Sequence, residues 1–383
     1  GLPWCKRWLH DRGIRVPLII RWPGKLAPGA ERDELVSFVD FAPTVLSVAG
    51  AKVPAHLQGR AFLGNAESPP RNYIFAARDR MDERYDIIRA IRDKRFKYIR
   101  NYEPYRPYDQ HLVYPESFPV MQEIRRVEKE GALEGAQKLF FAEAKPLEEL
   151  YDTQADPHEI QNIAGQPELA HELSRLREAL DVFLDESADT GFIPEIDLQA
   201  GLASAWPGPP ETLPVYEFAA DAEIFGKPVK DHVHLLNGTV RLRRLRAIKT
   251  LGLVPEALPL LRTALEDYDP AVACWAAVSL GHLRDGSPET RLALLKTLER
   301  EELSAKLGAA RALVLLGHTD QAMPVLLQTL AHENEYARLS AVETLEIAGL
   351  EHPGVREALE GVMNEKETYP RRIAATVLGV KIR

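Results

Sequence analysis

The chain has 383 residues, of which 45% are hydrophobic and 27% are charged, and its formal net charge is −9. This length predicts two or three domains with a sizeable core. The negative charge argues against a nucleic acid as the main partner, and no apolar run approaches the roughly 18–20 residues that span a bilayer. The two cysteines, Cys5 and Cys274, lie far apart and indicate neither a disulfide framework nor a zinc site.

Near the start of the chain, a short apolar run is followed by a helical pattern. Residues 16–22 (VPLIIRW) end at a Pro-Gly pair, which predicts a buried strand of a parallel sheet. Residues 39–50 (VDFAPTVLSVAG) predict a helix that Asp40 caps and that Gly50 ends in the left-handed conformation. The apolar stripe of this helix consists of Val45, Leu46, Val48 and Ala49. A strand followed by a helix indicates an α/β layer.

Residues 72–101 have the pattern of antiparallel strands. The segment NYIFAARD comes first, and then two β-rich arms, residues 87–92 and 96–100, flank a polar turn at Asp93 and Lys94. A polar helical stretch is expected over residues 121–141.

A second helix is predicted beyond this region. Asp156, followed by Pro157 and Glu159, has the spacing of a helix start with a capping box. An amphipathic stripe that should pack on the small sheet follows at Leu169, Leu173, Leu176, Leu180 and Phe183.

The last third of the chain is repetitive. Residues 189–228 are rich in Pro and Gly and predict an extended connector. Beyond it, an alanine recurs at a period of roughly 30 residues, each time followed by a leucine four positions later. These alanines are Ala247, Ala276, Ala309, Ala341 and Ala374. The pattern favours an α-solenoid similar to short HEAT repeats over an ordinary helical bundle, and the repeats are expected to fold separately from the first half.

The first half resembles the sulfatase family. In KRWLHDRGIRVPLIIRWPGKLAPGA, Lys6 precedes the "GIRVP" segment at the family's spacing, and VDFAPTVLSVAG, LQGRAF and ELYDTQADPHEIQNIA continue the resemblance to about residue 186. The implied fold is an α/β sulfatase-like portion, made of the end of the large sheet and a small antiparallel sheet with a packed helix. An all-α HEAT-like solenoid follows it.

The resemblance and the repeats together predict four parts. Residues 1–70 are expected to be the truncated end of the catalytic domain, and residues 71–187 the C-terminal subdomain. Residues 188–236 should form the connector and residues 237–383 the helical repeats.

The resemblance also implies what this chain lacks. The family's nucleophile is a formylglycine made from Cys or Ser in a C-x-P-x-R type of motif, and the sequence contains no such motif. Most of the catalytic domain, including the nucleophile and metal ligands, is therefore expected upstream, and this chain alone is expected to be inactive. Ca²⁺ is the expected cofactor of the full-length enzyme, with no metal ligand in this chain. The DHVH segment at residues 231–234 lies in the predicted connector and is not taken as a substitute.

Five residues are candidates for contacts with substrate. The resemblance implies that Lys6 contacts the sulfate group, whereas its position beside two arginines is also compatible with a solvated basic patch. His10 either faces the pocket or is an ordinary turn histidine. The remaining candidates, on a charged loop at the expected pocket rim, are Arg78, Arg80 and Asp82. Mutual surface salt bridges are the alternative for that loop.

Three functions are compatible with the sequence. The first is the C-terminal part of a sulfatase that acts on sulfate esters or N-sulfate of a glycan or aryl substrate. The second is a non-catalytic HEAT-repeat protein with a degenerate sulfatase-like region and a protein partner. The third is a related phosphoester hydrolase. The resemblance favours a sulfated glycan as partner and a periplasmic or extracellular location, with no nucleic acid and no membrane span.

Overall fold

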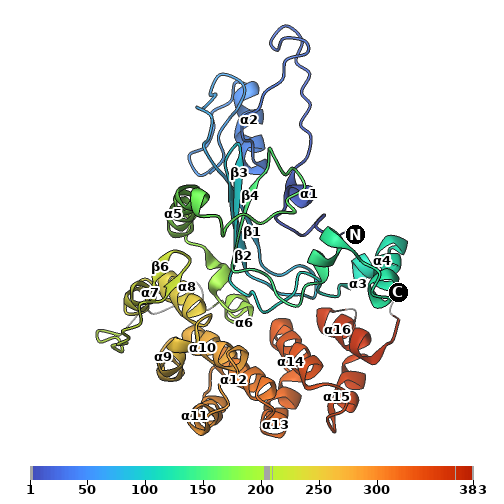
Figure 1. The fold of residues 1–383 in the computed structure, drawn as a ribbon, viewed down its shortest axis with the longest axis vertical. Helices are drawn as coiled ribbons and strands as arrows, with labels where there is room; N and C mark the ends of the chain where they lie inside the picture. Colours follow the sequence, from blue (N-terminus) through green and yellow to red (C-terminus); the bar gives the residue numbers. More distant parts are fainter. Residues whose placement is uncertain (1–2, 202–207, 209, 367, 382–383) are drawn as a thin grey trace.

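The computed structural model describes residues 3–201, 208, 210–366 and 368–381. A small sheet lies at the centre, with an arm of loops and a short helix at one end and a row of paired helices at the other (Figure 1). The middle of the predicted connector, residues 202–207 and 209, lies outside the described residues. Within the described part, none of the helices combines the length and apolar character that crossing a bilayer requires.

The sheet has four antiparallel strands in the order β1-β2-β3-β4. The strands are β1 (Ile74–Arg78), β2 (Ile88–Arg92), β3 (Phe96–Asn101) and β4 (Glu148–Asp152). The predicted hairpin is confirmed, with Arg92 opposite Lys97 across the turn. The strand β4 was not predicted, because its five residues are flanked by polar loops and show no clear alternation.

Helix α5 (Ala170–Glu186) covers one face of the sheet, as predicted. Its buried leucines are Leu173, Leu176, Leu180 and Leu184. Phe183 stacks on Phe75 of β1, with ring centroids 3.7 Å apart. The burial of this apolar stripe holds the helix on the sheet.

The predicted helix start at Asp156 is wrong. A 3₁₀ turn (Pro167–Leu169) leads into α5 only at Ala170. The Asp156 carboxylate accepts instead from the backbone N–H groups of Ile160 and Gln161, at 2.7 and 2.8 Å. Glu159, the expected partner in the capping box, turns into the core and pairs with a buried lysine. The competing tertiary ion pair therefore overrides the local helix signal.

The predicted helix over residues 121–141 is divided in two. Helix α4 (Pro119–Lys129) comes first, and a 3₁₀ helix (Gly135–Phe141) follows it. Gly131 has a positive φ of 69°, which ends α4.

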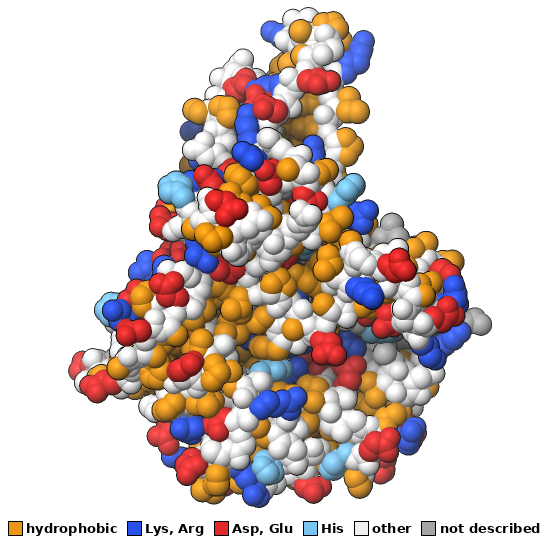
Figure 2. Space-filling model, in the orientation of Figure 1, with side chains coloured by type: hydrophobic (Ala, Val, Ile, Leu, Met, Phe, Trp, Pro, Cys, Tyr) orange, Lys and Arg blue, Asp and Glu red, His pale blue; other side chains and the backbone are white. Residues whose placement is uncertain are grey.

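Residues 16–22 do not form the predicted buried strand. The run is irregular, and Val16 and Ile19 are 55% and 91% exposed. Among the described residues, no strand pairs with this segment, so its apolar side chains meet no covering layer. Figure 2 shows hydrophobic side chains on the surface of this arm of the molecule.

Helix α2 (Phe41–Val48) forms where expected, and Gly50 ends it with a φ of 69°. Its predicted apolar stripe is not the buried face, because Val45 is 66% exposed. The buried side consists of Pro43, Thr44 and Ser47. Asp40 does not cap α2 with its side chain but accepts from the N–H groups of Ser37 and Arg60, each at 2.8 Å. Asp40 therefore ties loops together.

Short helices connect the sheet to the solenoid. The first is α6 (Glu195–Gln199), and α7 (Val229–Leu236) falls inside residues 188–236 and packs against the first repeat helix. A two-stranded ribbon, β5 (Glu223–Ile224) with β6 (Lys227–Pro228), precedes α7.

The predicted solenoid is confirmed as two rows of helices. The inner row consists of α8 (Arg241–Leu251), α10 (Pro270–His282), α12 (Leu303–Leu315), α14 (Glu335–Ala348) and α16 (Tyr369–Leu378). The outer row consists of α9 (Leu258–Ala264), α11 (Pro288–Leu298), α13 (Thr319–Leu330) and α15 (Val355–Val362).

All five repeat alanines lie in the inner row and are buried. These helices cross closely, since a Cβ on Gly308 of α12 would lie 3.0 Å from the Cα of Cys274 in α10. The small residues of the repeat therefore set the spacing of the inner row.

The inner row packs onto the sheet half of the molecule. One cluster of buried apolar side chains runs from Tyr85 and Tyr102 through Phe192 into α8 and α10. Trp275 of α10 donates its Nε1–H to the Phe192 carbonyl oxygen at 2.7 Å. Both halves thus share one core, which argues against separate folding of the repeats, and that expectation stays a prediction.

Removing Trp275 should destabilise both halves together. Trp275 is 6% exposed, and a buried Trp→Ala change costs about 3–5 kcal/mol through lost burial and a cavity. We expect Trp275→Ala to lower the free energy of unfolding by this amount in urea denaturation followed by circular dichroism. Leu292→Ala, at a site 67% exposed on α11, is the control and should change little. Two separate transitions, with the loss confined to one, would contradict a shared core.

A buried carboxyl at the same interface predicts a pH dependence. Asp197 of α6 is 2% exposed, and burial raises the pKa of its carboxyl to about 6, above the usual value of about 3.9. The folded state therefore holds this proton more tightly than the unfolded state, so stability should fall as pH rises from about 4 to about 6.

Asp197→Asn should remove this contribution. The variant should match the parent at pH 4 and exceed it by about 2–3 kcal/mol at pH 7, since each pKa unit is worth about 1.4 kcal/mol. Urea denaturation of both proteins across this pH range measures the difference. Parallel pH profiles would show that the Asp197 carboxyl does not titrate differently on folding.

Candidate functional site

The segment that carries Lys6 is fixed to the sheet by a buried ion-pair network. Lys97 of β3 is fully buried, and its Nζ lies 2.6 Å from Asp11 Oδ1 and 2.7 Å from Glu159 Oε1. It also donates to the Leu9 carbonyl oxygen at 3.0 Å. Asp11 begins the short helix α1 (Asp11–Ile14), and its N–H donates to Glu159 at 2.5 Å. Arg92 lies 3.2 Å from the other oxygen of Asp11, so two carboxylates, one ammonium and one guanidinium hold residues 9–11 in place.

His10 lies inside an aromatic cluster. It is 4% exposed, and its ring centroid is 4.5 Å from that of Trp4. Its Nε2 is 3.4 Å from the carboxylate of the fully buried Glu149, which also accepts from the hydroxyls of Tyr108 and Tyr151 at 2.6 Å. Burial alone would raise the pKa of Glu149, but His10 and the hydroxyl donors hold it below its usual value. His10 is therefore packed between the Trp4 ring and the Glu149 carboxylate. Its contact with substrate stays a prediction.

Arg78 and Arg80 are also held by other parts of the chain. Arg78 is 1% exposed, and its guanidinium carbon lies 3.8 Å from the centroid of the Trp8 ring. Burial lowers the pKa of Arg78 to about 10. The Nε–H of Arg80 donates to both carboxylate oxygens of Glu195 in α6, with N···O distances of 2.8 and 2.9 Å. These contacts join the loop to its neighbours, and substrate binding by either arginine stays a prediction.

Lys6 differs from the other candidates because it is exposed. Its Nζ lies 5.6 Å from the centroid of the Tyr114 ring, and Arg7 approaches the same ring. Arg7 is neutralised by Asp82, which has a φ of 50°. Among the described residues, Lys6 has no carboxylate within 4.0 Å. Lys6 is therefore a cation on a fixed segment that can meet an anion from outside, whereas Asp82 already has a partner.

The described residues contain no group of three or more His, Cys, Asp or Glu side chains that could hold a metal ion. The DHVH segment lies on α7, where His232 is buried with its Nε2 3.1 Å from the Ile224 carbonyl oxygen. Burial lowers the pKa of His232. The described residues therefore offer no such cluster for the Ca²⁺ expected of the full-length enzyme.

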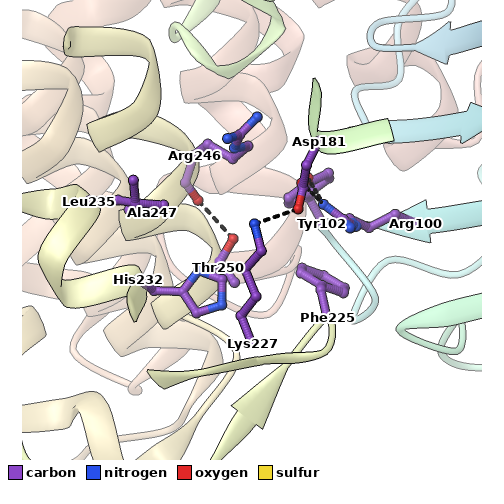
Figure 3. Close-up of a pocket in the computed structure, with 10 residues that line it drawn as sticks. All are labelled: Arg100, Tyr102, Asp181, Phe225, Lys227, His232, Leu235, Arg246, Ala247 and Thr250. Atoms are coloured by element: carbon purple, nitrogen blue, oxygen red, sulfur yellow. Dashed lines mark hydrogen bonds and ion pairs between the residues drawn. The ribbon is translucent and has the colours of Figure 1, made fainter. Parts of the chain in front are cut away.

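A small pocket near α7 also offers no binding site (Figure 3). Its volume of about 10 Å³ is that of a single water. Its charges satisfy one another, since Asp181 accepts from Arg100 at 2.7 Å and from Lys227 at 2.6 Å.

The sequence did not point to Lys97, Glu149 or Glu159 as residues that position the segment. The only signal was the presence of charged residues in buried strands, such as Lys97 in FKYIRN. Charges are buried only when they are paired, so each of them required a partner elsewhere in the chain.

Comparison with known proteins accounts for both halves. Residues 3–114 match the family model described as N-sulphoglucosamine sulphohydrolase, C-terminal, and residues 290–379 match the model of HEAT repeats. The first half of the chain is therefore similar to the C-terminal region of sulfatases, and HEAT-like repeats follow it.

Three curated relatives are similar to the first half. An ulvan-active sulfatase of Formosa agariphila is 47% identical over 197 residues, which are 51% of this chain and 33% of that protein. A second ulvan-active sulfatase of the same organism is 34% identical over 42% of this chain and 31% of its own length. An N-acetylglucosamine-6-O-sulfatase of Bacteroides thetaiotaomicron is 28% identical over 46% of this chain and 26% of its own length. The chain thus spans about a third or less of each relative.

The Lys97 network can be tested by removing its central cation. Lys97→Met would leave the buried Glu159 without its ion-pair partner and Asp11 with Arg92, 3.2 Å away, as its nearest cation, and breaking a buried pair costs about 3–5 kcal/mol. We expect a loss of this size in urea denaturation. Lys94→Met in the adjoining turn is the matched control, because Lys94 and its partner Asp33 are exposed and such pairs contribute at most about 1 kcal/mol. Equal losses in the two variants would refute the role of Lys97.

Proposed function

We propose that this chain forms the C-terminal part of a sulfatase that hydrolyses sulfate esters of a sulfated glycan, with Lys6 contacting the sulfate group. The observation that carries the proposal is the position of Lys6. It is an exposed ammonium without a carboxylate partner among the described residues, on a segment that the buried Lys97 fixes to the sheet.

The chemistry of sulfate transfer explains the value of such a group. Negative charge on the sulfate oxygens must be held while the ester bond breaks, and a preorganised cation stabilises that charge without rearrangement. Lys6 supplies the cation, and the Lys97 network supplies the preorganisation. The nucleophile belongs to a part of the enzyme outside this sequence, because no C-x-P-x-R type of motif occurs in it.

The substrate class is inferred from the relatives. The relative that is 47% identical is described as active on ulvan, and another is described as acting on N-acetylglucosamine-6-O-sulfate groups. Both descriptions concern sulfated saccharides. We therefore place the substrate of the whole enzyme among sulfated polysaccharides and their fragments.

A role for the repeats as a platform for a protein partner has less support. Solenoids use an extended concave surface for binding, but here the inner row packs on the molecule's own sheet half. The outer helices expose single apolar side chains, such as Leu292 and Leu327, which need no partner.

Replacing Lys6 should impair turnover and leave the fold intact. In the full-length sulfatase that contains this chain, Lys6→Ala should lower kcat/KM about a hundredfold, as expected for the loss of one preorganised group at the reacting centre. Hydrolysis of a sulfated ulvan fragment in the presence of Ca²⁺ provides the measurement.

The control is Lys25→Ala, which removes an exposed lysine of the arm, away from Tyr114. It should leave kcat/KM unchanged. Equal activity of the parent and a folded Lys6→Ala variant would reduce Lys6 to a surface residue and would remove the main support for this role.

A further inference from the structure

A second cavity of about 540 Å³ lies between the sheet half and the inner row of the solenoid. One wall is the loop after β3, and the other is formed by α10, α12 and α14. Figure 2 shows charged and histidine side chains gathered where the two halves meet. The charged, histidine and tyrosine residues that line this interdomain cleft are Arg84, Tyr105, Arg106, Asp109, His111, His282, Arg284, Arg311, Glu343 and Glu346.

Two cations of the cleft lack a full counter-charge. Arg311 of α12 is 11% exposed, its nearest carboxylate is Glu343 at 3.6 Å, and its Nε has no hydrogen-bond acceptor among the described residues. Burial, and then repulsion from Arg106, lowers the pKa of Arg311. Arg284 is exposed and donates to the Leu315 carbonyl oxygen. The solenoid wall therefore presents guanidinium groups with unused donors.

The acidic residues of the cleft are already engaged. Glu346 accepts two hydrogen bonds from Arg84, at 2.5 and 2.8 Å. Asp109 accepts from Arg125 at 2.8 Å. Glu343 lies between Arg80 and Arg311, at 3.6 Å from each. The donors that a ligand would meet are therefore mostly cationic.

A neutral histidine adds an unpartnered ring nitrogen. The ring of His282 stacks on Tyr105, with centroids 3.5 Å apart. Burial lowers the pKa of His282 to about 2, so its ring is uncharged at neutral pH. Its buried Nε2 has no hydrogen-bond partner among the described residues. A buried polar atom of this kind is costly unless a ligand or water satisfies it.

We propose that the interdomain cleft binds a sulfate group carried by a saccharide, with Arg284 and Arg311 as the cations that hold it. The sulfated ligand class rests on the proposed function. Neither Lys6 nor Tyr114 lines the cleft. We therefore treat the cleft as a separate site, one wall of which comes from the repeats. Its volume is within the range of about 300–1,000 Å³ that ligand sites occupy, and arginine forks suit planar pairs of oxyanion oxygens.

The experiment is calorimetric titration of the 383-residue chain with glucosamine 6-sulfate. Unsulfated glucosamine, glucuronic acid and inorganic sulfate are titrated in parallel. We expect the sulfated sugar to bind, and glucosamine and glucuronic acid to bind at least about tenfold more weakly, because a charged hydrogen bond is worth more than a factor of ten. If glucuronic acid binds as tightly as glucosamine 6-sulfate, the preference for sulfate is overturned. If inorganic sulfate binds as tightly as glucosamine 6-sulfate, the proposal that the cleft recognises a saccharide is overturned.

Three variants test the residues. Arg311→Gln and Arg284→Gln should each weaken binding of glucosamine 6-sulfate by about tenfold or more. Arg284 is exposed, so its variant tests the proposal even if the buried Arg311 is needed for folding, and thermal unfolding checks both. Arg291→Gln, on the outer helix α11 and also exposed, is the matched control and should bind normally. Unchanged binding in both Arg284 and Arg311 variants would overturn the site.

The outcome can be separated from that of the proposed catalytic role. Lys6→Ala should leave this binding unchanged, because Lys6 does not line the cleft. Loss of binding in Lys6→Ala would overturn the existence of a separate site. If the full-length enzyme fails to hydrolyse sulfate esters while the cleft still binds the sulfated sugar, the proposed function fails and the binding site stands.

Discussion

One buried carboxylate links the two halves at their first point of contact. Glu103, two residues after β3, is fully buried and pairs with Arg106 in its own loop and with Lys249 Nζ of α8 at 2.5 Å. Burial alone would raise its pKa, but the two cations hold it well below its usual range. A buried charge of this kind is tolerated only with its partners in place. The loop that forms one wall of the interdomain cleft is thereby fixed to the first inner helix.

The same principle governs the sheet end of the molecule. Lys97 joins the N-terminal segment to β3, and Asp40 joins α2 to the loops around it. Each is a charged side chain that neutralises or satisfies groups far away in the sequence. Many apolar side chains of this arm, such as Ile19, Val45 and Val48, are exposed, so polar contacts contribute much of what holds it together.

Local patterns predicted the elements whose partners are close in the chain. The alternation in the β2–β3 hairpin and the alanine register of the inner row were sufficient, because each element packs mainly on its neighbours. The same reasoning failed at Asp156, where a capping-box pattern was overridden by the pairing of Glu159 with Lys97. The prediction of a buried strand also failed at residues 16–22. An apolar run indicates that a segment can be buried, but it does not identify the part of the protein that would cover it.

The candidate site was predicted only in part for the same reason. Motif spacing identified Lys6, but spacing alone gave no indication that His10 lies among aromatic rings or that Arg80 is bound to Glu195. The cleft was not foreseen at all. Its walls come from segments about 200 residues apart, such as those of Tyr105 and Arg311, and no local pattern encodes their meeting.

The packing of the inner row has a consequence for how the chain can change. The row touches the sheet half at intervals along its length, through Lys249 in α8, Trp275 in α10, Glu346 in α14 and Thr376 in α16. Adding or deleting one helix pair between these points would displace every later contact by about 8–10 Å, the distance between packed helices. A solenoid standing alone can lengthen or shorten by whole units. Here the contacts with the sheet half constrain the number of repeats from α8 to α16.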